Sequence, residues 1–175
     1  MSLKLAENFE DVLHALNNNE VDFMIVGGYA VVFYGYGRTT GDLDIWINPE
    51  DRNKKRLITA FKELKFPSKL VDHIKNTDFK KPFAVKIGAE PIQIDLFNAI
   101  TGVEYTDARE RSISYKYVDN LVVNFIHLQD LIVNKMLTGR LKDAADVEQL
   151  HNINKYSTDK RIVAWLKKFF GRKKT

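Results

Sequence analysis

The chain opens with apolar residues at helical spacing and continues with short apolar runs of strand length. Residues 5–18 place apolar side chains three or four positions apart, which predicts an amphipathic helix that ends in the asparagine run at 17–19. Residues 21–26 form a strand-length apolar run that stops at Gly27-Gly28. Residues 29–34 then fit a short buried helix.

The next segment alternates strictly between apolar and polar positions. In residues 42–47, every second side chain is aliphatic, and Asp42, Asp44 and Trp46 occupy the other side. This pattern predicts a half-buried strand. Pro49 suits the first turn of a helix that runs to about Leu64.

Two strand pairs and a group of helices complete the pattern. The strands are expected at 83–87 and 92–97, joined by a turn at 88–91, and at 112–117 and 121–125. The helices are expected at 127–138, 141–154 and 158–170. This order predicts an α+β (α/β-like) core with a small helical part at its C-terminal end.

Composition narrows the class of protein. The sequence has no cysteine, so it has neither disulfides nor thiolate metal sites. It has no apolar run long enough to span a membrane, and its first residues lack the layout of a secretory signal. These features favour a cytoplasmic protein with no membrane contact.

The net charge of +4 is concentrated near the C-terminus. Five lysines and arginines lie in the last nine residues, and without them the net charge is −1. A basic tail of this kind can bind phosphate backbones, but it is also typical of a solvated, frayed terminus.

The acidic strand carries the candidate chemistry. Asp42 and Asp44 are two residues apart on a strand, so their carboxylates point the same way and repel each other. A hard divalent cation that prefers oxygen ligands, Mg²⁺ or Mn²⁺, would relieve this repulsion. The alternative is a strand face that is simply exposed to water.

Two neighbouring features favour the metal. Gly27-Gly28 lies between a strand and a helix, where the backbone can approach a phosphate closely, although a glycine pair can also form only a tight turn. Asp95 lies on the strand 92–97, again opposite a row of aliphatic residues. If this strand is beside 42–47, three carboxylates converge as in two-metal sites for phosphoryl or nucleotidyl transfer.

With these motifs, the sequence resembles the nucleotidyltransferase superfamily, whose fold is that of DNA polymerase beta. The matching features are Gly27-Gly28, Asp42 and Asp44 on one strand, and Asp95 on a later one. Over roughly residues 20–150 the chain looks like the bacterial AbiEii-like, type IV toxin-like subgroup. The segments that carry this second likeness are Val26–Val31, Arg38–Asp44, Asp130–Lys135 and Gly139–Val147.

The resemblance implies a nucleotidyltransferase fold with a mixed central sheet flanked by helices. Residues 1–126 would form the catalytic core, and residues 127–175 would form a helical part that closes the cleft and ends in the basic tail. It also implies transfer of a nucleoside monophosphate from a nucleoside triphosphate to a hydroxyl or phosphate acceptor, with release of pyrophosphate.

The residues implied for this reaction form two groups. Asp42, Asp44 and Asp95 would be catalytic and would hold the metal, and the nucleotide would contact Gly27, Gly28, Arg38, Thr40, Lys135 and Asp146. Lys135 has support of its own, because it falls on the apolar stripe of its helix and must either extend outward or meet a buried anion. Asp143, like Asp146, also fits the simpler role of an acid near a helix N-terminus.

The acceptor and the biological role stay open at this stage. RNA, tRNA, a protein hydroxyl and a small molecule all fit as acceptors, and the toxin-like resemblance favours a macromolecule and a cognate antitoxin. A different class of answer is a non-catalytic nucleotide-binding or toxin–antitoxin partner module with the same fold. The intact set of three acids argues for the enzyme.

Overall fold

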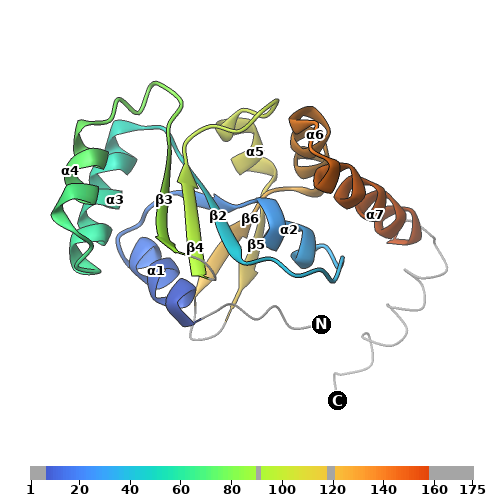
Figure 1. Cartoon of the computed structure of the whole chain (residues 1–175), viewed down its shortest axis with the longest axis horizontal. Coiled ribbons are helices and arrows are strands. Elements are labelled where there is room, and N and C mark those ends of the chain that lie inside the picture. Colours follow the sequence, from blue (N-terminus) through green and yellow to red (C-terminus); the bar gives the residue numbers. More distant parts are fainter. Residues whose placement is uncertain (1–6, 90–91, 118–120, 158–175) are drawn as a thin grey trace, which may run out of the picture.

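The computed structural model describes residues 7–89, 92–117 and 121–157, which form one mixed sheet with helices packed around it (Figure 1). The helices in this part of the chain are α1 (Glu7–Asn18), α2 (Gly27–Phe33), α3 (Asp51–Glu63), α4 (Ser68–Asn76), α5 (Tyr105–Arg111), α6 (Leu128–Thr138) and α7 (Leu141–Ser157). The strands are β1 (Phe23–Ile25), β2 (Asp42–Ile47), β3 (Ala84–Ala89), β4 (Ile92–Phe97), β5 (Ile113–Lys116) and β6 (Val122–Phe125).

The sheet has the strand order β3-β4-β2-β1-β6-β5. The pairs β2–β4 and β1–β6 are parallel, and the other neighbours are antiparallel. Helices α3 and α4 lie at one end of the molecule and α6 and α7 at the other, with the sheet between them (Figure 1). This confirms the mixed α/β architecture expected from the sequence.

The strands that matter most for the site match their predicted bounds. Alternation located β2 at 42–47 and β4 at 92–97, and the structure has the same limits. Their predicted neighbourhood is also correct, since they pair in parallel with Leu43 beside Ile94 and Asp44 beside Asp95. Five aliphatic side chains of the two strands are buried in the core, namely Leu43, Ile45, Ile47, Ile94 and Leu96.

Other limits differ. The predicted strand at 21–26 is only β1, and α2 begins at Gly27 rather than at Tyr29. Residues Gly88 and Ala89, expected in a turn, extend β3 and pair with β4. The helix expected at 158–170 lies outside the described residues.

Two helices have no counterpart in the sequence-based expectation. They are α4 and α5, each short and each with only two buried side chains. Helix α5 covers part of the acidic strand β2. Its Tyr105 packs edge-on against Trp46, with ring centroids 5.1 Å apart. Trp46 is therefore 1% exposed, and β2 is half-buried only in its first half.

The core is a single apolar cluster on the sheet and the helices that cover it. Its largest fully buried side chains include Trp46, Phe9, Phe61 and Phe125. No helix in the described part of the chain is long and apolar enough to cross a bilayer.

Candidate active site

Three carboxylates line one wall of a cavity of about 670 Å³. Asp44 and Asp95 are directly paired across the parallel strands β2 and β4, and Asp42 is paired with Gln93. Because side chains alternate along a strand, Asp42, Asp44 and Asp95 all lie on the same face of the sheet. The structure therefore brings the three predicted acids together.

Asp44 is half-buried and is the acid of the three whose pKa is clearly shifted. Burial raises its pKa to about 6. A hydrogen bond from the Gly28 backbone N–H, 3.3 Å from Oδ2, lowers this pKa, and the nearby charge of Asp95 raises it. The carboxylate is thus held in a place where its own negative charge is costly unless a cation approaches.

The two glycines fit closely around this carboxylate. Gly27 has φ +59°, and a Cβ there would lie 1.9 Å from Asp44 Oδ2. A Cβ at Gly28 would lie 2.2 Å from Thr40 Oγ1 and 3.1 Å from a guanidinium nitrogen of Arg38. Only glycine lets the start of α2 approach both the acid and these two polar side chains.

Asp95 has two polar neighbours. Its Oδ1 accepts a hydrogen bond from Gln93 Nε2 at 2.7 Å, and its Oδ2 lies 3.5 Å from Lys86 Nζ. Lys86 is the residue opposite Asp95 on the antiparallel strand β3, and its side chain is 70% exposed. This exposed lysine is not a predicted site residue, because only the β3–β4 register reveals its position.

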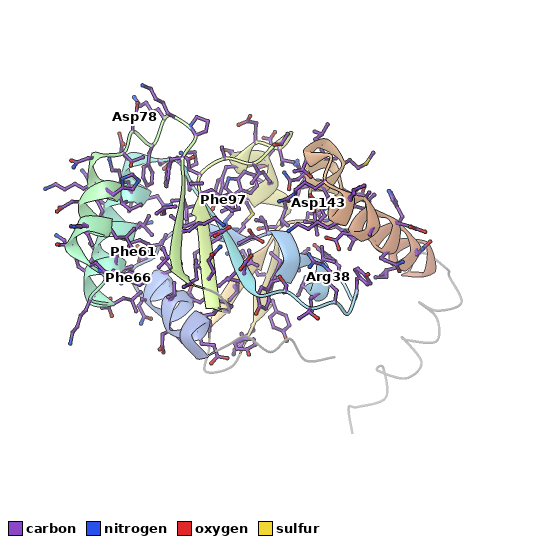
Figure 2. All side chains as sticks on the ribbon, in the orientation of Figure 1. Arg38, Phe61, Phe66, Asp78, Phe97 and Asp143 are labelled. Carbon is purple, nitrogen blue, oxygen red and sulfur yellow. The ribbon has the colours of Figure 1, made fainter. Side chains whose placement is uncertain are left out.

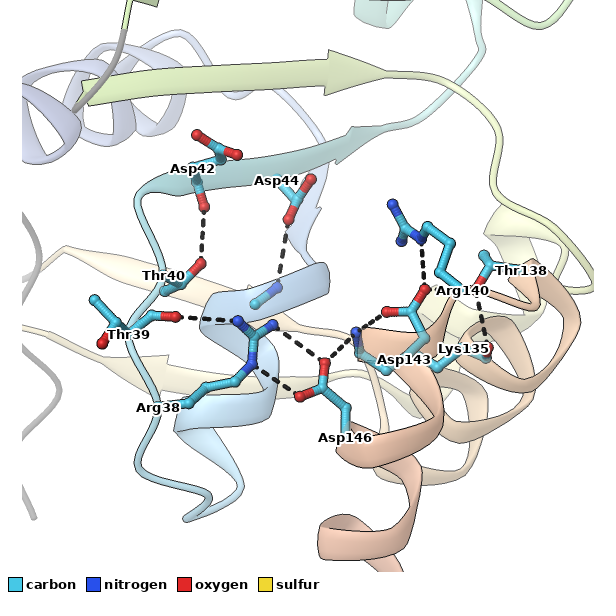
Figure 3. A network of polar contacts seen from close by, with 11 residues as sticks. Arg38, Thr39, Thr40, Asp42, Asp44, Lys135, Thr138, Arg140, Asp143 and Asp146 are labelled. Carbon is cyan, nitrogen blue, oxygen red and sulfur yellow. Dashed lines mark hydrogen bonds and ion pairs between the residues drawn. The ribbon is translucent and has the colours of Figure 1, made fainter.

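The opposite wall is built by α6, α7 and the turn between them (Figure 3). Lys135 of α6 is 4% exposed and lies 2.7 Å from a carboxylate oxygen of both Asp143 and Asp146 of α7. Asp146 also binds Arg38, which comes from the loop before β2, at 2.9 Å. These ion pairs connect the loop before β2 to α6 and α7.

Asp143 is fully buried and is neutralised by several donors. Burial raises its pKa, but hydrogen bonds from Lys135, Thr138 and Arg140 outweigh this and lower it to about 2. The distances are 2.7 Å to Lys135 Nζ, 2.6 Å to Thr138 Oγ1 and 2.6 Å to Arg140 Nε. The left-handed Gly139, with φ +68°, ends α6 and lets α7 fold back so that these groups meet.

Most of the predicted nucleotide contacts border the same cavity, namely Gly27, Gly28, Arg38, Thr40 and Lys135. Asp146 is not among the lining residues; it lies behind them and holds Arg38 and Lys135. The cavity also includes residues not predicted from sequence, chiefly Lys86, Phe97, Arg140 and Lys142. No spacing pattern distinguishes these four side chains from ordinary surface residues.

The carboxylates suit a hard divalent cation in their chemistry, since all their donors are oxygens and the half-buried Asp44 lacks an ion pair in the described structure. The three carboxylates are not yet close enough together to coordinate one ion. Within residues 7–89, 92–117 and 121–157, no three acidic or histidine side chains have the geometry of a metal site. The side chain of Asp95 is instead engaged by Lys86 and Gln93.

Comparison with known families is decisive at this point. Residues 5–169 match the family described as "Nucleotidyl transferase of unknown function (DUF2204)". The chain belongs to this family. The match spans nearly the whole sequence and includes both walls of the cavity. No curated protein matches the sequence.

Solved structures share the fold at low sequence identity. A putative nucleotidyltransferase from Thermotoga maritima is 11% identical, with a TM-score of 0.50 over 83% of this chain and 91% of its own. The antibiotic-resistance factor ANT(2'')-Ia is 10% identical in its solution structure, with a TM-score of 0.51 over 94% of this chain and 96% of its own. A crystal structure of ANT(2'')-Ia in complex with adenylyl-2''-tobramycin also has a TM-score of 0.51, with 11% identity over 83% of this chain and 92% of its own.

These findings establish a nucleotidyltransferase family and fold. They leave the AbiEii-like, toxin-like subgroup as a prediction from the sequence motifs.

Proposed function

We propose that this protein transfers a nucleoside monophosphate from a nucleoside triphosphate to an acceptor hydroxyl. The oxygen of the acceptor would form a bond to the α-phosphorus, and the bond from that phosphorus to the bridging oxygen of pyrophosphate would break. The observation that carries the proposal is the pairing of Asp44 with Asp95 in the cavity wall, beside the glycine-bordered start of α2.

Asp42, Asp44 and Asp95 would hold Mg²⁺ or Mn²⁺ against the triphosphate. The bound metal would neutralise the charge that develops on the phosphate oxygens. The raised pKa of Asp44 supports this assignment, because a desolvated carboxylate next to a second acid is stabilised by a cation.

Asp95 is the proposed proton acceptor for the attacking hydroxyl. Of the three acids, Asp95 lies on the strand nearer the edge of the sheet, because β4 is between β2 and the edge strand β3, which carries Lys86. An acceptor entering from this side would meet Asp95 before Asp44. The proton would pass from the acceptor hydroxyl to the Asp95 carboxylate.

Gly27, Gly28, Arg38 and Thr40 would line the phosphate side of the cavity. Arg38 is held by Asp146 and also donates to the carbonyl of Thr39 at 3.1 Å, so its guanidinium has a fixed position (Figure 3). A fixed cation contributes more to orienting a phosphate than one that must first be ordered. Lys135 would add positive charge from within its ion-pair cluster.

The finer expectations belong to this proposal as well. The division into a catalytic core at 1–126 and a closing helical part at 127–175 is supported by a cavity that lies between β2–β4 and α6–α7. A toxin-like role with a cognate antitoxin, a cytoplasmic location and an RNA, tRNA or protein acceptor rest on the sequence arguments alone.

Label transfer tests the proposal directly. The protein is incubated with each α-labelled nucleoside triphosphate, Mg²⁺ and either total RNA or cell lysate, and pyrophosphate release is followed in parallel. The wild-type chain should transfer label, and Asp44→Asn should reduce transfer at least about a hundredfold, because it removes a charge that acts on the reacting phosphate.

Asp22→Asn is the control for the loss of an aspartate charge outside the cavity. Asp22 is 29% exposed, is paired with Arg109 and does not line the cavity. Its variant should retain transfer. Triphosphate binding with neither label transfer nor pyrophosphate release would instead favour the non-catalytic binding module.

A further inference from the structure

The cavity is chemically divided into two halves. Near Gly28, Asp44 and Lys135 its lining is charged or polar. Beyond Asp95 the lining becomes mainly apolar, with Pro82, Phe83, Ala84, Phe97, Ala99 and Ile100. The polar half suits the phosphates of a triphosphate and leaves the apolar half for a flat, uncharged group.

Phe97 is the central residue of the apolar half. It lies two positions after Asp95 on β4 and therefore on the same face of the sheet. Its side chain is only partly buried, and it has no aromatic partner within the described part of the chain. A half-buried ring that lines a cavity beside a phosphoryl-transfer site is suited to stacking on a flat, unpaired base.

A basic loop is fixed next to this ring. Asn98 is 5% exposed, and its side chain donates to the carbonyls of Phe79 and Lys81 at 2.9 and 3.0 Å and accepts from the Phe83 N–H at 2.9 Å. These three bonds hold the loop that carries Lys80 and Lys81 at the end of β4. Both lysines are exposed.

The same loop continues a strongly basic region of the chain. Residues 51–81, which form α3, α4 and this loop, contain ten lysines and arginines and four acidic residues. Residues 1–50 contain two lysines and arginines and eight acidic residues. Most of the ten are exposed and without an ion pair in the described structure. Lys54 is an exception, because it binds the Thr77 carbonyl at 2.6 Å and ties the loop to α3.

We infer that the apolar half of the cavity and the basic loop at Lys80 and Lys81 form a docking site for the end of a single-stranded nucleic acid, which serves as the acceptor. The terminal base would stack on Phe97, with the terminal hydroxyl near Asp95. The strand would leave the cavity past this loop, where Lys80 and Lys81 would meet its phosphates.

This inference rests on the proposed function and names its acceptor. A small-molecule acceptor would use the apolar half but would gain nothing from a basic region outside the cavity. A nucleic acid uses both, because single-strand sites combine aromatic stacking with a basic path for the backbone. The combination of an apolar half of the cavity with exposed lysines just outside it therefore favours a polymer as the acceptor.

The test measures binding without chemistry. A short fluorescent single-stranded RNA is titrated with the full chain in the absence of triphosphate and metal, and anisotropy is followed at several salt concentrations. Lys80→Glu should weaken binding about tenfold and reduce its salt dependence. Lys116→Glu changes an exposed lysine on β5, at the opposite edge of the sheet, and should change binding less than about twofold.

A second pair of variants tests the stacking position. Phe97→Leu keeps an apolar side chain but removes the ring, and it should weaken RNA binding about tenfold. Phe66→Leu is its control, since Phe66 packs on Phe61 with centroids 4.9 Å apart and does not line the cavity (Figure 2). Circular dichroism of all four variants checks that each one is folded.

The outcomes separate the inference from the proposed function. RNA binding with this pattern but without label transfer would support the docking site and contradict the proposed enzyme. Label transfer to a protein or a small molecule, with no RNA binding, would overturn the docking site and leave the enzyme standing. Equal effects of Lys80→Glu and Lys116→Glu would also overturn it.

Discussion

The two walls of the cavity treat their acids in opposite ways. On the sheet wall, Asp44 is half-buried without an ion pair in the described structure, and desolvation raises its pKa to about 6. On the helical wall, Asp143 is buried among Lys135, Thr138 and Arg140, and its pKa is lowered to about 2. Asp143 receives direct hydrogen bonds from two cations and a hydroxyl, whereas Asp44 receives one backbone hydrogen bond and only the charge of Lys135 through space.

This difference separates structural acids from acids available for chemistry. A buried carboxylate whose lone pairs are fully used by lysine, arginine and hydroxyl groups stabilises the fold and has little left to offer a substrate. A half-buried carboxylate with one backbone hydrogen bond keeps lone pairs available for a cation. The same residue type thus has two roles, and the surrounding donors decide between them.

Removal of the lysine from the helical wall should have the largest effect on stability. Lys135→Met would leave Asp143 and Asp146 buried with fewer positive partners, which should lower the free energy of unfolding by about 3 kcal/mol. Chemical denaturation measures the loss. Lys86→Met is the matched control, since Lys86 also pairs with an aspartate but is 70% exposed, and its loss should be small. Equal losses would contradict the comparison.

Metal should stabilise the sheet wall alone. Mn²⁺ at about a hundred times its dissociation constant should raise the free energy of unfolding by about 2.7 kcal/mol in the wild-type protein. Asp44→Asn should abolish this gain, and EDTA should reverse it. Asp130→Asn, an acid bound by Arg111 outside the cavity, should retain the gain even if its baseline stability is lower. A gain that persists in Asp44→Asn would place the metal elsewhere.

The two acids should give opposite pH dependences in metal-free protein. The pKa of Asp44 is higher in the folded state than its ordinary 3.8, so stability should fall as pH rises from about 4 to about 6 and then level off. The pKa of Asp143 is lower, so its contribution is present above about pH 4 and is lost as pH falls towards 2. Thermal unfolding across this range measures both effects.

Asp44→Asn sharpens the pH comparison. The substitution should remove the decline in the free energy of unfolding between pH 4 and 6, which is up to about 2 kcal/mol. It should leave the loss of stability below about pH 4 unchanged. A decline that survives the substitution would show that another group titrates there.

The close approach of Gly27 should have a smaller, local effect. Gly27→Ala places a Cβ where the Asp44 carboxylate now lies, so this carboxylate must shift. The variant should lower label transfer about tenfold, because even a small misplacement of a site residue slows the reaction. Gly35→Ala is the control: it also has a positive φ, at +98°, but meets no atom within 4 Å. Both variants carry backbone strain, so a shared loss of activity would point to strain alone.

Sequence alone located much of the sheet wall. Alternation set β2 and β4, and because side-chain direction follows directly from position on a strand, the convergence of Asp42, Asp44 and Asp95 was predictable once the strands were neighbours. The short helices α4 and α5 were not, since two buried residues each are too few to define a helical period.

The helical wall was predictable only in part. The position of Lys135 on an apolar stripe left two possibilities, an outward-extending side chain or a buried anion. The structure shows the second, and its partners depend on how α7 folds back after Gly139. The pairing of Lys86 with Asp95 depends on strand register, and the anchoring of the basic loop depends on Asn98. The chain-wide net charge also hid the basic region at 51–81, because acids elsewhere cancel it.

The parallel pairing of β2 with β4 has a consequence for how the chain acquires its activity. Asp44 and Asp95 are separated in sequence by α3, α4 and β3, and they meet only when this long connection has closed. Such non-local pairings tend to limit folding rates. A refolding intermediate could contain every helix and still lack the carboxylate pair, so recovery of metal affinity during refolding should report the completed sheet.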